Sequence, residues 1–439
     1  MQFNTRNKLV MAAAFFVSSP VFAVDLVGVH DLAVKSDPAL QAAAYRKDAT
    51  GENKRQAWSN LLPSLSGSAG ASRGGSKTSI QSTQVDDSDT DTENWGFDLR
   101  QSLYDQSNYE QLDIARGQVS QADAIYNIAY QDFLVRVAGN YFAVLTAQDG
   151  VIFAEAEEKA LQRQFEQAEQ RFEVGLTAVT DVHEARASYD NARARAIVSR
   201  NNLADTKEAL YELTGQYFDD IDPLQDELPL VSPLPESPEE WLDIAMQYNP
   251  AINAARMSVE IAEATTRLQR AGHFPTLDLV ASYQNFTNNE YVLRDDFQQP
   301  IATTALTNKS SQIGLRLTVP IYQGGAVSSR TRQARYLLNA VNEDLDQQQR
   351  ATVRATNNAY RAVIAGIEQV RAFNQAMISA ESALEATQAG FEVGTRTIVD
   401  VLIAQQRYFQ AQRDNSIARH SYVVDHLRLK AAAGVLVEE

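Results

Sequence analysis

Polar side chains that could do acid–base or metal chemistry occur along the whole chain, but their spacing matches no catalytic or metal-binding motif. The histidines lack HExxH spacing, and the chain has no cysteine to act as a partner ligand. Acidic pairs such as Asp219-Asp220 have no second group arranged for acid–base catalysis. Gly324-Gly325 is not followed by the lysine and hydroxyl residue of a phosphate-binding loop. We therefore expect no enzyme activity, no metal and no cofactor. The histidines are His30, His183, His273, His420 and His426.

The most informative polar residues follow two glycines that are set in similar segments. Gly175 precedes Asp181, and Gly394 precedes Arg396 and Asp400. A glycine commonly ends a helix in the left-handed conformation, and an acidic residue stabilises the N-terminus of the next helix. From the pattern alone, helix capping by the aspartates and a solvated arginine in the turn is the simpler interpretation. The alternative is that these side chains contact one another and hold a gate closed.

Long helices must position these turns. No proline occurs between Pro63 and Pro223 or after Pro320, and interior proline is costly in a helix. Both stretches are rich in Ala, Gln, Glu and Arg, with apolar residues three and four apart. At 1.5 Å per residue the first helix would be about 100 Å long. The pattern predicts two helical hairpins, which comprise residues 107–171 with 179–214 and residues 327–391 with 398–433.

Two strand-like runs precede each hairpin. Ile313, Leu315 and Leu317 alternate with polar or small residues, and Trp95, Phe97 and Leu99 repeat the pattern. Weaker runs begin at Leu65 and Leu277, and we expect polar loops at 74–92 and 286–310. No segment after residue 23 is apolar enough for a membrane helix, so a membrane role would need β-strands. Four strands cannot close a barrel, and an open edge is not tolerated in lipid. These strands therefore predict that several chains share one barrel.

The chain is duplicated with a period of about 215 residues. The segment 171–182 aligns without a gap to 390–401, and shorter landmarks such as 37–40 and 249–252 recur in the same order. We predict a signal peptide at 1–23, a first repeat at 24–221, an acidic proline-rich linker at 222–238 and a second repeat at 239–439. Each repeat would contain a helix, two strands and a long hairpin.

The beginning of the chain reads as an export signal. Arg6 and Lys8 precede an apolar run, and Val21-Phe22-Ala23 resembles a cleavage site. Cleavage there would change the formal charge from −17 to −19, because two basic residues and no acidic residue are removed. Such acidity argues against nucleic acid as a partner. The absence of cysteine excludes disulfides and a lipid anchor on an N-terminal cysteine.

Three segments, 172–182, 393–402 and 319–325, make the mature chain resemble the TolC family of outer-membrane efflux proteins. The resemblance implies a mixed α+β membrane protein that forms a homotrimer in the outer membrane. In that family a twelve-stranded barrel is shared by the protomers, and a helical tunnel extends into the periplasm. The resemblance also implies a periplasmic adaptor (membrane fusion) protein, an inner-membrane efflux pump or ABC transporter, and contact with outer-membrane lipid. The exported molecules would be drugs and toxic compounds or, in type I secretion, proteins.

The resemblance further implies that polar links close the periplasmic end. In this chain they would join Arg396 to Thr180 and Asp181, and Gln164 to Asp346. The adaptor would contact the turns at Gly175, Leu176, Gly394 and Thr395.

Two positions depart from the family pattern. In the family a tyrosine forms a hydrogen bond with the aspartate that corresponds to Asp181. This chain has Phe391 at the position of that tyrosine, so we expect its closed state to be held by fewer links. In the family the narrowest point of the duct carries two rings of acidic side chains, one helical turn apart. Asp400 matches the first ring, but Ile403 replaces the second, so we expect weaker cation selectivity than the family pattern implies. The alternative to a transport duct is a structural coiled-coil protein of the envelope without a pore. The alternating strands favour the duct, because a spacer has no use for them.

Overall fold

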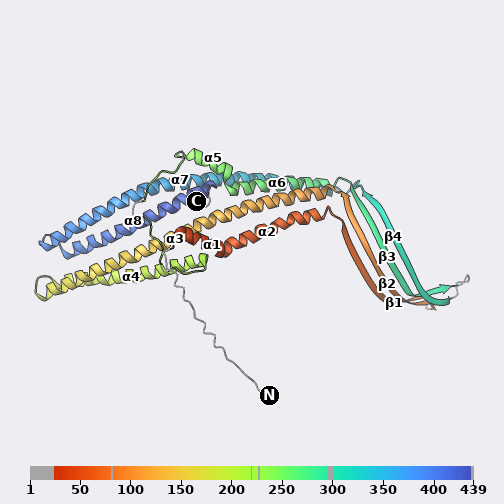
Figure 1. Cartoon of the computed structure of the whole chain (residues 1–439), viewed down its shortest axis with the longest axis horizontal. Helices are drawn as coiled ribbons and strands as arrows, with labels where there is room; N and C mark the ends of the chain where they lie inside the picture. The colour runs from red at the N-terminus through yellow and green to blue at the C-terminus, as the bar shows by residue number, and fades with distance from the viewer. Residues whose placement is uncertain (1–23, 81–82, 219, 226–227, 295–299, 437–439) are drawn as a thin grey trace, which may run out of the picture. The chain divides into compact units, whose positions relative to one another are not determined.

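The computed structural model describes residues 24–80, 83–218, 220–225, 228–294 and 300–436 (Figure 1). The predicted signal peptide lies outside these residues. Elements follow the order α1, α2, β1, β2, α3, α4, and then α5, α6, β3, β4, α7, α8. The second half therefore repeats the order of the first, and the predicted fold class with its internal repeat is confirmed.

The long hairpins consist of α3 (Gln106–Glu173) with α4 (Val179–Thr214), and α7 (Ala326–Glu392) with α8 (Ile398–Ala433). Every end lies within two residues of the sequence-based prediction. The agreement has a local cause: these stretches lack proline, and each long helix ends at a turn that contains a glycine.

Two helices, one short and one twice as long, precede each pair of strands. They are α1 (Leu26–Ser36) with α2 (Pro38–Ser59), and α5 (Pro238–Tyr248) with α6 (Pro250–Ala271). The break falls at Asp37-Pro38 and again at Asn249-Pro250, because a residue before proline is driven out of the helical region. Asn249 also caps α6 by accepting hydrogen bonds from the amides of Ala251 and Ile252.

The strands form one antiparallel sheet in the order β1-β2-β3-β4. They are β1 (Ser64–Ile80), β2 (Thr83–Tyr104), β3 (Thr276–Arg294) and β4 (Pro300–Thr318). The register aligns Leu65 with Leu99, Leu99 with Ala281 and Ala281 with Ile313, so apolar side chains share one face. Exposed large apolar residues of this face include Leu65, Phe97, Tyr283, Ile313 and Leu315.

The expected loops at 74–92 and 286–310 are wrong for most of their length, because the strands continue through them. Apolar and polar residues no longer alternate in these segments, but the backbone hydrogen bonds between the strands do not depend on that alternation. Cross-strand hydroxyl contacts such as Ser72 with Thr92, at 2.7 Å, stabilise the polar part of the ladder.

By contacts the chain divides into two compact units, and each draws on both repeats. Among the described residues, the first comprises those within 24–37, 136–231 and 366–424, and the second comprises those within 38–135, 232–365 and 425–436. In the first unit small residues of α3, α4 and α8 are buried, which lets the helices pack closely. In the second unit Ala57 of α2, and Leu61 in the turn after it, pack against Leu112 and Ala115 of α3.

The linker between the repeats is held by tyrosine hydroxyls. In the first unit Tyr141 donates to the carbonyl of Asp222 at 2.8 Å, and Tyr422 Oη accepts from the amide of Val231 at 3.0 Å. Burial, and then the charges of Asp222 and Asp25, raise the pKa of Tyr141 to about 12. Across the described residues, no helix is both long and apolar enough to cross a membrane.

Candidate functional site

The two helical turns that contain the predicted site residues have the same backbone structure. Gly175 and Gly394 adopt φ values of 76° and 79°. Leu176 N–H donates to the carbonyl of Arg171 and Gly175 N–H to that of Phe172, at 2.8 and 2.9 Å. Thr395 and Gly394 make the matching bonds to Gly390 and Phe391, at 2.8 and 3.1 Å. This double bond pattern around a left-handed glycine is the Schellman motif, and it makes both turns well-defined ends of their helices.

The aspartates after the turns lie in the first turn of the next helices, and Asp400 caps its helix. Asp400 accepts hydrogen bonds from the amide and hydroxyl of Thr397, both at 2.9 Å, and its own amide donates to the Thr397 hydroxyl. These bonds from the Thr397 backbone and side chain, with the nearby Arg396 charge, lower the pKa of Asp400. Asp181 accepts a hydrogen bond from the Thr177 hydroxyl. Capping by hydrogen bonds therefore describes Asp400, whereas α4 has no side-chain cap hydrogen bond and Asp181 contributes its charge to the first turn of that helix.

Arg396 lies against the end of its own hairpin. A Cβ atom added at Gly390 would come within 2.8 Å of the Arg396 Cγ, so the side-chain stem crosses the space that glycine leaves open. Within the described residues, Arg396 makes no ion pair or hydrogen bond to Thr180 or Asp181. The link from Arg396 to these residues stays a prediction.

The second predicted link joins a residue of the first unit, Gln164, to one of the second, Asp346. Asp346 of α7 accepts from Arg350 at 2.6 Å. Gln164 of α3 is half-buried, and its Oε1 has no hydrogen-bond partner among the described residues. A Gln164–Asp346 contact stays a prediction as well.

Phe391 is the residue at which the structure adds most to the sequence. Its ring packs against a buried cluster built from α3, α4 and α8. The guanidinium carbon of Arg171 lies 4.7 Å from the centre of that ring, which is the geometry of a cation–π contact. Sequence reasoning missed Arg171, because nothing local indicates that the end of α3 meets the end of α7.

Ile403 lies one helical turn beyond Asp400 in α8 and is 43% exposed. Its neighbours Val401 and Leu402 are buried. Asp400 is partly exposed as well, so both side chains belong to the accessible surface of the helix, and their role at a constriction stays a prediction.

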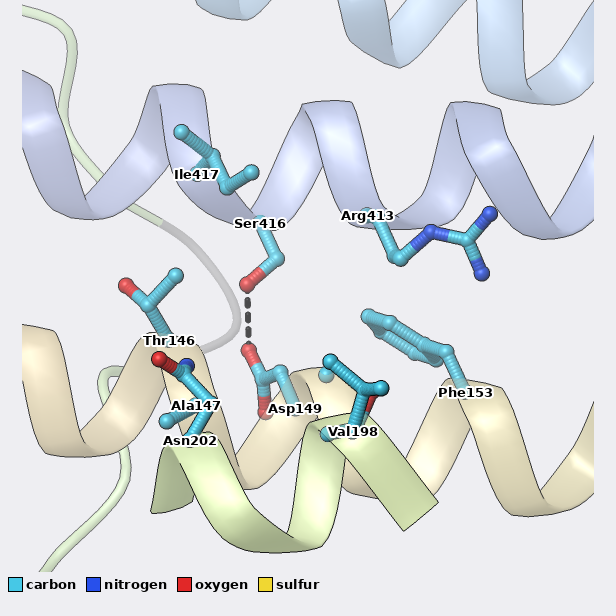
Figure 2. Close-up of a pocket in the computed structure, with 11 residues that line it drawn as sticks. Thr146, Ala147, Asp149, Phe153, Val198, Asn202, Arg413, Ser416 and Ile417 are labelled. Atoms are coloured by element: carbon cyan, nitrogen blue, oxygen red, sulfur yellow. Dashed lines mark hydrogen bonds between the residues drawn. The ribbon is translucent and has the colours of Figure 1, made fainter. Parts of the chain in front are cut away.

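Farther along the first unit, α3, α4 and α8 surround a cavity of about 290 Å³ (Figure 2). Asp149 and Ser416 meet across it in a hydrogen bond, as Figure 2 shows. Arg413 on its wall binds Glu157 at 3.2 Å, and Arg195 binds the same carboxylate at 2.7 Å. Because the charged groups are paired within the protein, this cavity offers little to a ligand.

Comparison with known proteins identifies the fold and its role. The chain matches the family described as outer membrane efflux protein over residues 29–216 and 241–435. It is 38% identical to the outer membrane protein TolC of Vibrio cholerae serotype O1 over 430 residues, which cover 98% of this chain and 95% of that protein. It is 33% identical to the Escherichia coli K12 protein of the same name, over 95% of this chain and 83% of that one.

A solved structure shares the fold at lower identity. The outer membrane protein VceC of Vibrio cholerae superposes with a TM-score of 0.74 at 19% identity, covering 93% of this chain and 96% of that one. The chain therefore belongs to the outer membrane efflux protein family, and it is an outer-membrane exit duct that extends into the periplasm.

Proposed function

We propose that three copies of this chain assemble into one duct, whose periplasmic end is closed by the two helical turns of each copy. The single observation that carries the proposal is the pairing of two features in one chain. One is an apolar-faced sheet of four strands, and the other is a duplicated long hairpin that ends in a well-defined turn.

The sheet requires partners. In the described chain β1 and β4 are the edge strands, and each has one side that no strand covers. Unpaired backbone groups are costly in lipid, and closure into a barrel satisfies them. Neighbouring copies would supply the missing pairs, so that the protomers share a single barrel in contact with outer-membrane lipid.

The turns would hold the gate. Arg396 would pair with Thr180 and Asp181 of a neighbouring copy, and Gln164 with Asp346. One such exposed ion pair contributes only about 0–1 kcal/mol. Threefold repetition would still favour a closed state that a docking partner must overcome, because a ligand shifts a conformational equilibrium by its differential affinity.

The same turns would contact a periplasmic adaptor protein. Leu176 is 75% exposed beside Gly175, and Val393 is exposed to a similar degree beside Gly394 and Thr395. Exposed apolar side chains on a well-defined turn are suited to burial by a partner. The adaptor would connect the duct to an inner-membrane efflux pump or ABC transporter, which would determine whether small toxic compounds or proteins are exported.

Membrane fractionation of the native protein tests the assembly. We expect a trimer in the outer membrane that resists detergent at low temperature and separates into protomers on heating. A soluble periplasmic rod would contradict the proposal, and it would favour a structural coiled-coil role without a pore.

A further inference from the structure

We infer that Arg171 is a further gate residue: its guanidinium on the ring of Phe391 links the end of α3 to the end of α7 and stabilises the closed state. The inference rests on the proposed function of the turns as a gate. It assigns a role to an arginine outside the predicted set, and it explains how a chain with phenylalanine at position 391 can still connect its two hairpins.

The geometry supports an energetic interaction. The guanidinium carbon lies 4.7 Å from the ring centre, within the roughly 6 Å over which a cation is attracted to an aromatic face. Among the described residues no carboxylate forms an ion pair with Arg171, and this includes Glu173 and Glu392, which are adjacent in sequence to the two partners. The ring is therefore the main partner of this charge.

Both partners are held in place. The Phe391 ring packs against a buried cluster, so it cannot follow the arginine without leaving its apolar neighbours. The Arg171 carbonyl accepts the Leu176 amide, and the Phe391 carbonyl accepts the Gly394 amide, in the two Schellman turns. A movement that separates the hairpins at these turns must therefore pull the guanidinium off the ring. The cluster residues are Leu161, Ala168, Ala185, Ala192, Ile398 and Leu402.

The internal repeat shows that the cation–π pair is specific to one pair of positions. In the alignment of 171–182 with 390–401, Arg171 corresponds to Gly390 and Phe391 corresponds to Phe172. Phe172 is 45% exposed, and Gly390 has no side chain to offer it. The repeat therefore does not reproduce the pair at its equivalent positions, and the equivalent phenylalanine is a matched control.

The cation–π pair also differs chemically from the other proposed links. A guanidinium keeps its charge at all accessible pH values, and the phenylalanine ring does not titrate. A link from Arg396 to a carboxylate disappears when that carboxylate is protonated. The effect of removing Arg171 should therefore persist in acid, whereas the effect of removing Arg396 should diminish.

The test is a comparison of single-trimer conductance in planar bilayers at pH 7 and in acid. Arg171→Gln and Phe391→Leu remove the two partners, and Arg171→Lys retains a cation. Controls are Arg163→Gln, an exposed arginine of α3 that donates to the Lys159 carbonyl, and Phe172→Leu. Arg396→Ser reports on the gate itself, and heat stability of the trimer reports on folding.

We expect Arg171→Gln and Phe391→Leu to have similar effects. For each cation–π pair that is lost, the ratio of open to closed duct should rise about two- to fivefold, and the double variant should show no further increase. Arg171→Lys should recover part of the closure, and the controls should behave as wild type. If Arg396→Ser opens the duct and Arg171→Gln does not, the inference about Arg171 is wrong, but the proposed gate at the turns is retained. If neither variant changes the conductance of a stable trimer, the proposed gate fails together with the inference.

Discussion

At the scale of single residues, the charge of the proposed constriction departs from the pattern that the family resemblance implies. Asp400 is held as a carboxylate by Thr397, which lowers its pKa, while the accessible position one turn later is the apolar Ile403. With three protomers the constriction would contain three carboxylates rather than six. An apolar ring next to a single acidic ring attracts cations less strongly than two acidic rings.

Block by a trivalent cation tests this arrangement. Ile403→Asp places a second carboxylate on the same exposed face, so we expect tighter block and stronger cation selectivity than in wild type. Asp400→Asn should weaken both. Dose–response measurements of conductance with hexamminecobalt(III) would provide the comparison. Equal block in wild type and Ile403→Asp would show that position 403 does not line the narrowest point.

The pairing of Arg171 with Phe391 could not be predicted from the sequence, although both turns could. Gly175 and Gly394 indicate their turns locally, through the need for a positive φ. A cation over a ring depends instead on how two helices from different repeats meet. The aspartates illustrate the same limit: the pattern predicted the capping role of Asp400, but not the hydroxyl partners Thr177 and Thr397.

At the scale of elements, a buried carboxylate joins three helices. Glu157 of α3 is 0% exposed and binds Arg195 of α4 and Arg413 of α8. A buried charge without its partners is strongly destabilising, because desolvation is no longer compensated. This network therefore ties the helices of the first unit together, and nothing in the spacing of the sequence indicates it.

Removal of both arginine head groups tests the network. The double variant Arg195→Met/Arg413→Met should lose about 3–5 kcal/mol of the free energy of unfolding, because Glu157 is left unpaired. Urea unfolding followed by helix content provides the measurement. Glu157→Leu in the same background should restore most of the stability. The control Arg200→Met breaks a pair with the exposed Glu155 and a longer contact, at 3.9 Å, with Glu158, and it should cost less than about 1 kcal/mol. Similar costs for buried and exposed pairs would contradict the assigned role.

The elements themselves were largely predictable, and the exceptions have local causes. Helix ends followed from glycine and the absence of proline. Strand lengths did not, because pairing continues through polar residues where apolar alternation ends. The boundaries of the repeats at 24–221 and 239–439 stay a prediction, since the compact units each combine parts of both repeats.

At the scale of the whole molecule, the chain has groups that the proposed assembly with other copies would satisfy. Its sheet has two uncovered edges, and its predicted gate residues Arg396 and Gln164 lack their predicted partners within the described chain. The sequence predicts four strands, and four strands cannot close a barrel, so a barrel shared by several chains could be predicted. The number of copies came from the family resemblance and not from the spacing of residues.

The most direct test of a duct gated at its turns is the conductance of the purified trimer in a planar bilayer, compared with that of Arg396→Ser. A duct closed in this way should show a small, steady conductance as wild type and a severalfold increase in the variant, because one set of three links is removed. A well-folded trimer that conducts no ions in either form would contradict a gated duct.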